Sequence, residues 1–388
     1  MKKIAVLGKG TAGMFAASHF YKWNTDCEIE LHYDPSILPQ TVGEGSTLDF
    51  PRALYENIGF THLDLKYVDG SFKGGIWKTG WSDGVEYMHN FPPPGVGYHF
   101  NAVKMQDWIL NQLKDKIKIV KHNTTADQVD ADFVMDCSGK PNDYNDFILT
   151  ESIPVNAVHV TQCYWNHAEF QYTLTIARPY GWVFGIPLQN RCSIGYMYNN
   201  NITTLEEVKE DVKQVFKDYN LTPSTDHNTF SFNNYYRKQN FTDRIAYNGN
   251  ASFFLEPLEA TSISLMDTIL RMASDNWFNN ISLDTINEDY ISSVQEIETM
   301  IMMHYFAGSK FKTKFWDFAQ ERGEKTIATA KHNKKFNDFV NQSKFDMSTL
   351  LKMNGNYGTW GKQSFKQNLE NLNLYEKIAS CKPTNTRL

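Results

Sequence analysis

Hydrophobic and polar positions along the first 35 residues predict a strand, a tight turn, a helix and a second strand. Residues 4–7 form a short apolar run, and residues 8–13 read Gly-Lys-Gly-Thr-Ala-Gly before a second apolar run at 14–17. We expect the first strand and helix to occupy roughly residues 3–22, because glycines allow the chain to turn sharply between them. Alternating positions over 27–33 predict the next strand, which ends before Asp34.

Farther along the chain, the spacing of apolar residues changes repeatedly between helical and strand periods. Residues 70–100 are rich in Gly, Trp and Pro, which predicts strands with an irregular excursion. The other expected elements are helices over 47–66, 102–116 and 204–219, a buried strand over 131–137, antiparallel strands over 155–200, a strand, glycine turn and helix over 244–272, and helices from about 283 onward.

This order of elements predicts an α/β fold with a discontinuous nucleotide-binding domain. Such interleaving is typical of a glutathione-reductase-type FAD-binding Rossmann domain that carries an inserted antiparallel-sheet substrate domain and a helical C-terminal region. The expected division is residues 1–45, 100–145 and 245–275 for FAD binding, 46–99 and 146–244 for the substrate sheet, and 276–388 for the helical region.

The glycine turn itself is a dinucleotide-binding fingerprint. Gly8 permits the tight turn, Gly10 lets the backbone approach a pyrophosphate, and Gly13 lets helix and sheet pack closely. The phosphates then lie at the helix N-terminus, beside Thr11 and Ala12. The alternative is a glycine-rich turn in a Rossmann-like domain without a ligand.

An acidic residue about 20 positions after the glycine turn usually binds the ribose hydroxyls of the dinucleotide. Asp34 fits that spacing, and Glu30 is the weaker candidate. The alternative for Asp34 is an ordinary turn position before proline.

Composition describes a globular chain and excludes several classes of function. The 388 residues are 41% hydrophobic and 21% charged, with a formal net charge of −6 and no long basic run, so we expect no nucleic-acid partner. The five cysteines are scattered without a Cys-x-x-Cys pair, which argues against a metal site or a disulfide framework. No apolar run is long enough to span a bilayer and no leader precedes the first strand, which predicts a cytoplasmic protein with no membrane partner.

Five segments in shared order resemble the flavin-dependent tryptophan halogenase family, over about residues 1–320. The segments are the glycine turn at 8–13, Val-Gly-Glu-Gly-Ser-Thr at 42–47, Ser-Phe-Lys-Gly-Gly-Ile at 71–76, Gly-Trp-Val-Phe-Gly-Ile-Pro at 181–187 and Glu-Pro-Leu-Glu-Ala-Thr-Ser at 256–262. The second segment resembles the flavin-contacting loop of the family, so Gly43, Glu44, Gly45 and Ser46 join the expected cofactor-binding residues.

The resemblance implies FADH2-dependent halogenation of an electron-rich aromatic substrate. Reduced flavin and oxygen give a flavin hydroperoxide, and a halide ion (chloride, bromide or iodide) attacks it to yield hypohalous acid. Lys73 matches the lysine that delivers the oxidant, by hydrogen bonding or as a haloamine, and Lys78 serves as a comparison. Glu259 matches the carboxylate that orients the oxidant or accepts the ring proton. The alternatives are a surface lysine and a helix-capping glutamate.

The resemblance also implies a halide site, a barrier strand and a substrate site. Thr261 and Ser262 begin a helix whose N–H groups suit a halide, although a routine polar helix start is the alternative. His89 and Phe91 match a pair that packs on the substrate ring, but a histidine in a loop is more often solvated. The expected barrier between flavin and substrate, or alternatively a core strand, comprises Trp182, Phe184, Ile186 and Pro187.

The last 70 or so residues do not match the family's pattern. Tryptophan-specific members hold the amino and carboxyl groups there, so we expect a more open site for phenols, indoles or anilines. A single glycine fingerprint predicts that a separate flavin reductase supplies FADH2, and assembly into a homo-oligomer stays open. The other candidate functions are a flavin-dependent aromatic monooxygenase and a non-catalytic FAD-binding homologue.

Overall fold

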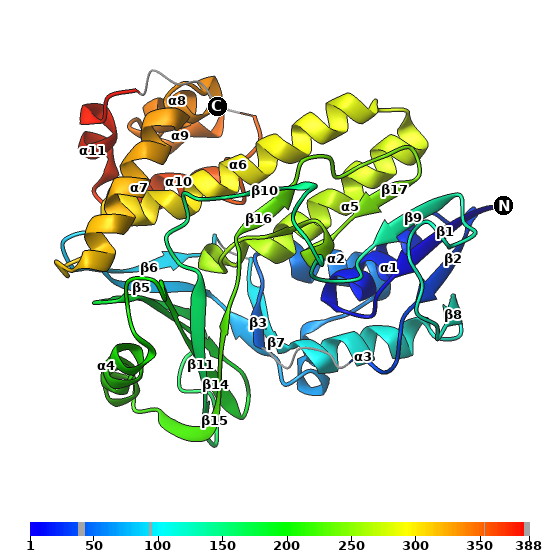
Figure 1. The fold of residues 1–388 in the computed structure, drawn as a ribbon, viewed down its shortest axis with the longest axis horizontal. Helices are drawn as coiled ribbons and strands as arrows, with labels where there is room; N and C mark the ends of the chain where they lie inside the picture. Colours follow the sequence, from blue (N-terminus) through cyan, green and yellow to red (C-terminus); the bar gives the residue numbers. More distant parts are fainter. Residues whose placement is uncertain (38–42, 93–94, 353, 384–388) are drawn as a thin grey trace. The chain divides into compact units, whose positions relative to one another are not determined.

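The computed structural model describes residues 1–37, 43–92, 95–352 and 354–383 (Figure 1). The chain divides into two compact units. The first unit contains Met1–Phe72, Gly97–Leu149 and Tyr235–Ser293. The second contains Lys73–Val96, Thr150–Asn234 and Val294–Leu388. Residues 46–72 thus group with the glycine turn, and the C-terminal helices group with the larger sheet.

A five-stranded parallel sheet forms the centre of the first unit, as an α/β fold requires. Its strand order is β17-β9-β1-β2-β8. The strands are β1 (Lys2–Leu7), β2 (Cys27–His32), β8 (Lys118–Val120), β9 (Phe133–Asp136) and β17 (Ile245–Tyr247). β1 lies in the middle, and its residues Ile4, Ala5 and Val6 are fully buried. The helix α1 (Thr11–Trp23) follows directly after the turn, which confirms the expected strand, turn and helix.

The single helix expected over 47–66 is wrong, because the chain breaks it at Gly59. The helix α2 (Asp49–Ile58) ends where Gly59 takes a left-handed conformation with φ of +74°. A short 3-10 helix over His62–Tyr67 then starts from a capping box between Thr61 and Asp64. These stop and start signals override the continuous helical spacing.

The rest of the first unit confirms the expected helices and adds two small sheets. The helices are α3 (Ala102–Leu113), α5 (Thr261–Asn279) and the first part of α6 (Leu283–Ala307). β10 (Phe147–Leu149), β16 (Tyr235–Arg237) and β18 (Phe253–Phe254) form one small antiparallel sheet. β3 (Gly43–Gly45) pairs antiparallel with β7 (Gly97–Asn101), and β4 (Ser71–Lys73) runs to the boundary between the units.

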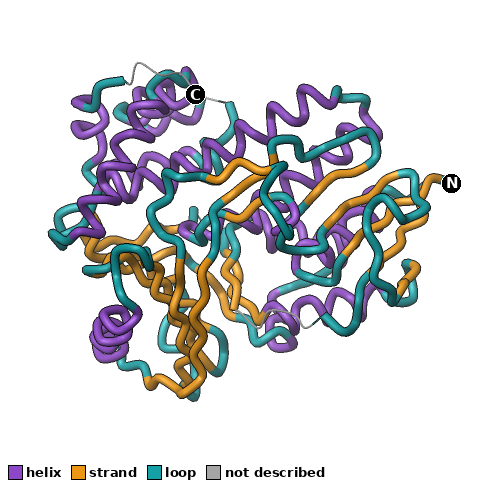
Figure 2. The backbone as a smooth tube through the Cα atoms, in the orientation of Figure 1, coloured by secondary structure: helices purple, strands orange, loops and turns teal. Residues whose placement is uncertain are grey.

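The second unit is built on a seven-stranded sheet of order β15-β11-β14-β13-β12-β5-β6. Strands are drawn in orange in Figure 2. Its strands are β5 (Gly75–Trp81), β6 (Val85–Asn90), β11 (Ala157–Tyr164), β12 (Thr173–Arg178), β13 (Gly181–Pro187), β14 (Arg191–Tyr198) and β15 (Thr222–Ser231). Every pair is antiparallel except β12 with β5. The antiparallel strands expected over 155–200 are confirmed.

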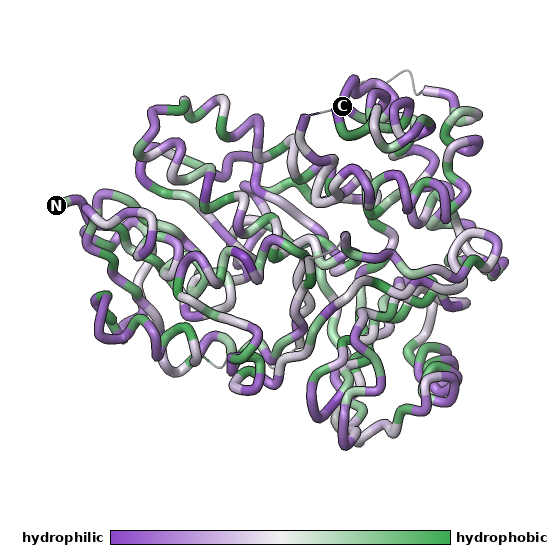
Figure 3. The backbone as a smooth tube through the Cα atoms, turned by 180° about the vertical axis from the view of Figure 1, so that it is seen from behind, coloured by the Kyte–Doolittle hydropathy of each residue, from purple (hydrophilic) through white to green (hydrophobic). Residues whose placement is uncertain are grey.

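The helix α4 (Leu205–Asp218) packs on this sheet through one apolar face. Val208, Val212 and Val215 are buried at helical spacing, and the capping box between Thr204 and Glu207 fixes the start of the helix. Hydrophilic and hydrophobic positions alternate along it, as Figure 3 shows by colour. The helix therefore closes one face of the sheet while it keeps its charged face in water.

Helices make up most of the C-terminal part of the second unit. They are the rest of α6, α7 (Lys314–Ala330), α8 (Lys334–Ser343), α9 (Met347–Leu351), α10 (Lys362–Asn371) and α11 (Leu374–Ser380). Tyr357 lies before α10, and its ring packs against Phe339 and Phe365, so aromatic contacts tie these short helices together. None of the helices in the described ranges is long and apolar enough to cross a membrane.

Gly13→Ala should destabilise the first unit. A Cβ atom at Gly13 would lie 1.9 Å from the carbonyl oxygen of Gly8, so backbone atoms would have to move. We expect the free energy of unfolding to fall by on the order of 3 kcal/mol in denaturant titrations of the ligand-free protein. Gly10→Ala is the matched control, because no atom lies within 4 Å of its Cβ position. Equal losses in the two variants would contradict this packing argument.

Candidate active site

The glycine turn leaves the N-terminus of α1 open to a ligand. Gly8 has a φ of +99°, and its N–H donates to the carbonyl oxygen of His32 over 2.7 Å. Gly10 is the N-cap of α1, and nothing lies within 4 Å of the position that a side chain would occupy there. The free N–H groups of the first helical turn, at Thr11, Ala12 and Gly13, therefore suit a pyrophosphate.

A hydrogen-bonded chain links this turn to the loop that carries Glu44. The Thr11 hydroxyl donates to Glu44 Oε1 over 2.8 Å, and Gln106 Nε2 donates to the Thr11 oxygen over 3.2 Å. Burial raises the pKa of the Glu44 carboxyl to about 6, although the Thr11 hydrogen bond opposes this shift. Ser46 is fully buried and exchanges hydrogen bonds with the backbone of Tyr98. The structure thus brings Thr11 and Glu44 together and anchors the loop behind them.

The two candidates for ribose binding have different surroundings. Asp34 lies beyond the end of β2 and accepts hydrogen bonds from the Ser36 hydroxyl and N–H, which lower the pKa of its carboxyl. These hydrogen bonds form the ordinary turn that is the alternative interpretation of Asp34 from the sequence. Glu30 is buried and pairs with Lys118 at 2.7 Å and His32 at 2.9 Å. Of the two carboxylates, only that of Asp34 lies past the carboxyl end of β2, so ribose binding there stays a prediction.

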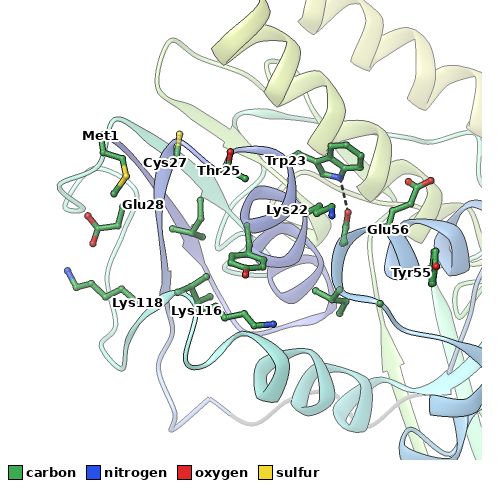
Figure 4. A pocket seen from close by; sticks show the side chains of 16 residues that line it. Met1, Lys22, Trp23, Thr25, Cys27, Glu28, Tyr55, Glu56, Lys116 and Lys118 are labelled. Atoms are coloured by element: carbon green, nitrogen blue, oxygen red, sulfur yellow. Dashed lines mark hydrogen bonds between the residues drawn. The ribbon is translucent and has the colours of Figure 1, made fainter.

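Figure 4 shows a groove of the first unit, with a volume of about 1050 Å³, whose lining includes no residue of the glycine turn. Cys27 and Lys118 begin their strands, and Trp23 ends α1, so the groove lies at the amino ends of the parallel strands. The Trp23 indole N–H donates to Asn57 Oδ1 over 2.9 Å at its edge. Because nucleotides bind at the carboxyl ends of such strands, this groove is not the dinucleotide site.

A strained turn carries Glu259 into the start of α5. Glu259 and Ala260 both adopt left-handed backbone conformations, with φ of +71° and +56°. Glu259 is 5% exposed, and Thr261 and Ser262 form the first turn of α5. Ala260, rather than Glu259, occupies the N-cap. Non-glycine residues in this region cost of order 1–3 kcal/mol each, and such strain gathers at functional sites.

Lys73, Phe91 and His89 lie together in the second unit. Lys73 is fully buried, and its Nζ lies 5.5 Å from the centroid of the Phe91 ring. The His89 ring meets the Phe91 ring edge to face at 6.1 Å. His89 is 1% exposed and lies in β6 opposite Ile76, so the solvated loop histidine offered as an alternative is wrong. The lysine therefore faces an aromatic wall rather than water.

Trp360 extends this wall and was missed in the sequence. Its ring lies 6.3 Å from that of His89 and 5.6 Å from that of His304. The residue is 2% exposed and follows a turn in the C-terminal region. No local motif marks it, because the contact joins residues about 270 positions apart in the sequence.

Three of the four barrier residues lie on one side of β13. Trp182 and Phe184 alternate along the strand, and their rings lie 6.1 Å apart. The Phe184 ring occupies the space above Gly195, where a Cβ would lie 2.0 Å from it. Ile186 continues this face, and Pro187 ends the strand on the other. The structure thus unites Trp182 and Phe184 in an aromatic surface, and their role as a barrier stays a prediction.

Lys78 is buried, so it cannot serve as an exposed lysine for comparison with Lys73. It is fully buried in β5, and its Nζ is hydrogen-bonded to His304 and Asn368. A variant at Lys78 would remove buried hydrogen bonds and is therefore no neutral control for Lys73.

Ala260→Gly should stabilise the protein. Glycine adopts the left-handed conformation without the clash that alanine suffers, so we expect a gain of about 1 kcal/mol in the free energy of unfolding. Ala273→Gly, in the buried middle of α5, is the control and should lose at least that amount. A loss of stability at both positions would show that the turn is not strained.

Glu44 should make the binding of an anionic dinucleotide depend on pH. Its carboxylate accepts a hydrogen bond from Thr11 in the first turn of α1, so a pyrophosphate bound there favours its protonated form. FAD affinity, followed by flavin fluorescence, should rise about tenfold from pH 8 to pH 5.5.

Glu44→Gln should remove this pH dependence and bind FAD at pH 8 as tightly as the unaltered protein does at pH 5.5. Glu56→Gln, in the groove at the other end of the strands, should keep the pH dependence. The same slope in Glu44→Gln and the unaltered protein would contradict the assignment.

Comparisons with known proteins point to one family. A family model described as tryptophan halogenase matches residues 3–123 and 97–349. Tryptophan 7-halogenase RebH from Lentzea aerocolonigenes is 23% identical over an alignment of 418 residues, which covers 81% of this chain and 78% of that protein.

Solved structures share the fold. Xcc4156, a flavin-dependent halogenase from Xanthomonas campestris, matches with a TM-score of 0.77 and 17% identity over 98% of this chain and 89% of that one. A tryptophan halogenase from Shewanella frigidimarina matches with a TM-score of 0.79 and 18% identity over 100% of this chain and 90% of that one.

Proposed function

This chain belongs to the tryptophan halogenase family, and from that premise we propose that Lys73 delivers an electrophilic halogen to an electron-rich aromatic substrate. Members of the family are flavin-dependent enzymes that halogenate aromatic compounds. The observation that carries the role of Lys73 is its fully buried ammonium group against the Phe91 ring. A lysine side chain usually keeps its charged end in water, so the complete burial of Lys73 favours a functional role for this residue.

The residues of the first unit fit FAD. The open N-terminus of α1 would hold the pyrophosphate, Asp34 the ribose, and the loop of Gly43, Glu44, Gly45 and Ser46 the flavin side. When bound in reduced form, FAD supplies hypohalous acid from oxygen and a chloride, bromide or iodide ion. A separate reductase would provide the reduced flavin, because the sequence shows one glycine fingerprint.

Lys73 acts on hypohalous acid in one of two ways that use the same amine. Its ammonium donates a hydrogen bond to the oxygen and makes the halogen more electrophilic. Alternatively, the neutral amine displaces water and forms a haloamine. In both cases the halogen bonds to a ring carbon, the ring loses a proton, and the oxygen leaves as water. Glu259 accepts that proton, while Thr261 and Ser262 hold the halide at the start of α5.

The aromatic wall of the second unit supports a flat, electron-rich substrate. The aromatic ring of the substrate would stack on the side chains of His89, Phe91 and Trp360. Stacking holds an aromatic ring without requiring particular substituents on it. Indoles, phenols and anilines all meet this requirement. The face of β13 with Trp182 and Phe184 would separate the organic substrate from the flavin and so suppress direct hydroxylation.

Lys73→Met should abolish halogenation but not the formation of hypohalous acid. The variant keeps the buried stem and loses the amine, so aryl halide formation should fall at least 100-fold in the presence of free methionine, which scavenges hypohalous acid that escapes into solution. The assay supplies FAD, a generic reductase, bromide and a panel of indoles and phenols, with mass spectrometry of products. A β-diketone trap reports hypohalous acid, which should form at the unaltered rate.

Lys213→Met, at an exposed position on α4 of the same unit, is the matched control and should halogenate normally. Unchanged halogenation in Lys73→Met would remove that residue from the mechanism. A gain of one oxygen instead of halogen in the unaltered protein would favour the monooxygenase, and no turnover would favour a non-catalytic FAD-binding protein.

A further inference from the structure

A second fully buried lysine joins the sheet of the second unit to its C-terminal helices. Lys78 Nζ lies 2.7 Å from His304 Nε2 and 2.6 Å from Asn368 Oδ1. These three residues belong to β5, α6 and α10. One amine therefore ties together segments that lie up to 290 positions apart.

The surrounding hydrogen bonds fix which groups donate. His304 Nδ1 lies 3.0 Å from the carbonyl oxygen of Met300, an acceptor only, so Nδ1 carries the proton and Nε2 accepts. Asn368 Oδ1 also accepts from the Tyr87 hydroxyl over 2.8 Å. Lys78 thus donates to both neighbours.

The ammonium of Lys78 also lies over two aromatic rings. Its Nζ is 5.6 Å from the ring centroids of both Tyr87 and Trp360. A cation at this distance is attracted by the ring face, and the attraction is strongest for tryptophan and in the absence of water. The position of the ammonium is therefore coupled to the orientation of the Trp360 ring.

The backbone around Trp360 is fixed independently of its ring. The Gly358 N–H donates to Glu296 Oε2 over 2.9 Å, and Thr359 N lies 3.2 Å from Met300 Sδ. Tyr357 and Trp360 exchange backbone hydrogen bonds at the base of the same turn. The indole ring meets the rings of His89, His304 and Phe365, and the Lys78 ammonium lies over its face.

Burying an ammonium group is costly, and replacing such a group together with its polar partners by apolar side chains is often neutral or stabilising. Retaining the charge is better explained by a gain in structural specificity. We propose that Lys78 is a positioning residue, which fixes the plane of Trp360 beside His89 and thereby sets which ring carbon of a bound arene is halogenated. This inference rests on the proposed function and deepens it.

Lys78→Met tests the proposal, because methionine is unbranched and apolar and removes only the charge and its hydrogen bonds. We expect the variant to fold, to form hypohalous acid at the unaltered rate, and to bind indole about tenfold more weakly in calorimetry. Its ratio of brominated indole isomers should move toward the ratio that free hypobromous acid gives. Calorimetry needs no flavin, so it tests the residue even if the unaltered protein does not halogenate.

Lys377→Met is the matched control. Lys377 donates to the carbonyl oxygen of Ala307 at the end of α6 over 2.7 Å and thus also ties a C-terminal helix to α6. It should change neither indole affinity nor the isomer ratio.

If Lys78→Met does not fold, Tyr87→Phe is the second variant. It removes one hydrogen bond to Asn368, so it should change indole affinity and the isomer ratio in the same direction as Lys78→Met but by a smaller amount. Unchanged affinity and isomer ratio in the folded variant would overturn the proposal.

Discussion

Two lysine ammonium groups, on Lys73 and Lys78, are withdrawn from water inside the second unit, and each must find compensation there. Lys73 faces the ring of Phe91, while Lys78 donates hydrogen bonds to His304 and Asn368. The aromatic partner of Lys73 comes from the chain just after β6, whereas the partners of Lys78 come from α6 and α10. The hydrogen bonds of Lys78 therefore tie the edge of the sheet to the C-terminal helices, beside the aromatic ring of Trp360.

The first unit has two helices that begin at turns with left-handed backbone. α1 starts after Gly8, whose left-handed backbone is free of strain, and α5 starts after Glu259 and Ala260, whose left-handed backbone is not. The turn before α1 leaves room for a pyrophosphate. The turn before α5 places a buried carboxylate beside the first turn of that helix. The strained turn lowers stability, which is a common property of active sites.

Local patterns in the sequence predicted most of the fold. The glycine turn after β1, the helical spacing over 204–219 and the alternation of β13 each act over a few residues, so they can be read without the rest of the chain. The burial of His89 and Lys78 and the approach of Trp360 could not be predicted, because they depend on pairings with segments up to 290 positions away. The break at Gly59 was missed because helical spacing continues past it, although the glycine itself was visible.

The central claim is that halogen passes from Lys73 to the arene without escaping into water. Its most direct test is the bromination of indole in the presence of free methionine, which scavenges hypobromous acid in solution. The account predicts that product yield is insensitive to methionine and that the isomer pattern differs from that of free hypobromous acid. Loss of the product with methionine, together with the isomer pattern of the free acid in its absence, would contradict it.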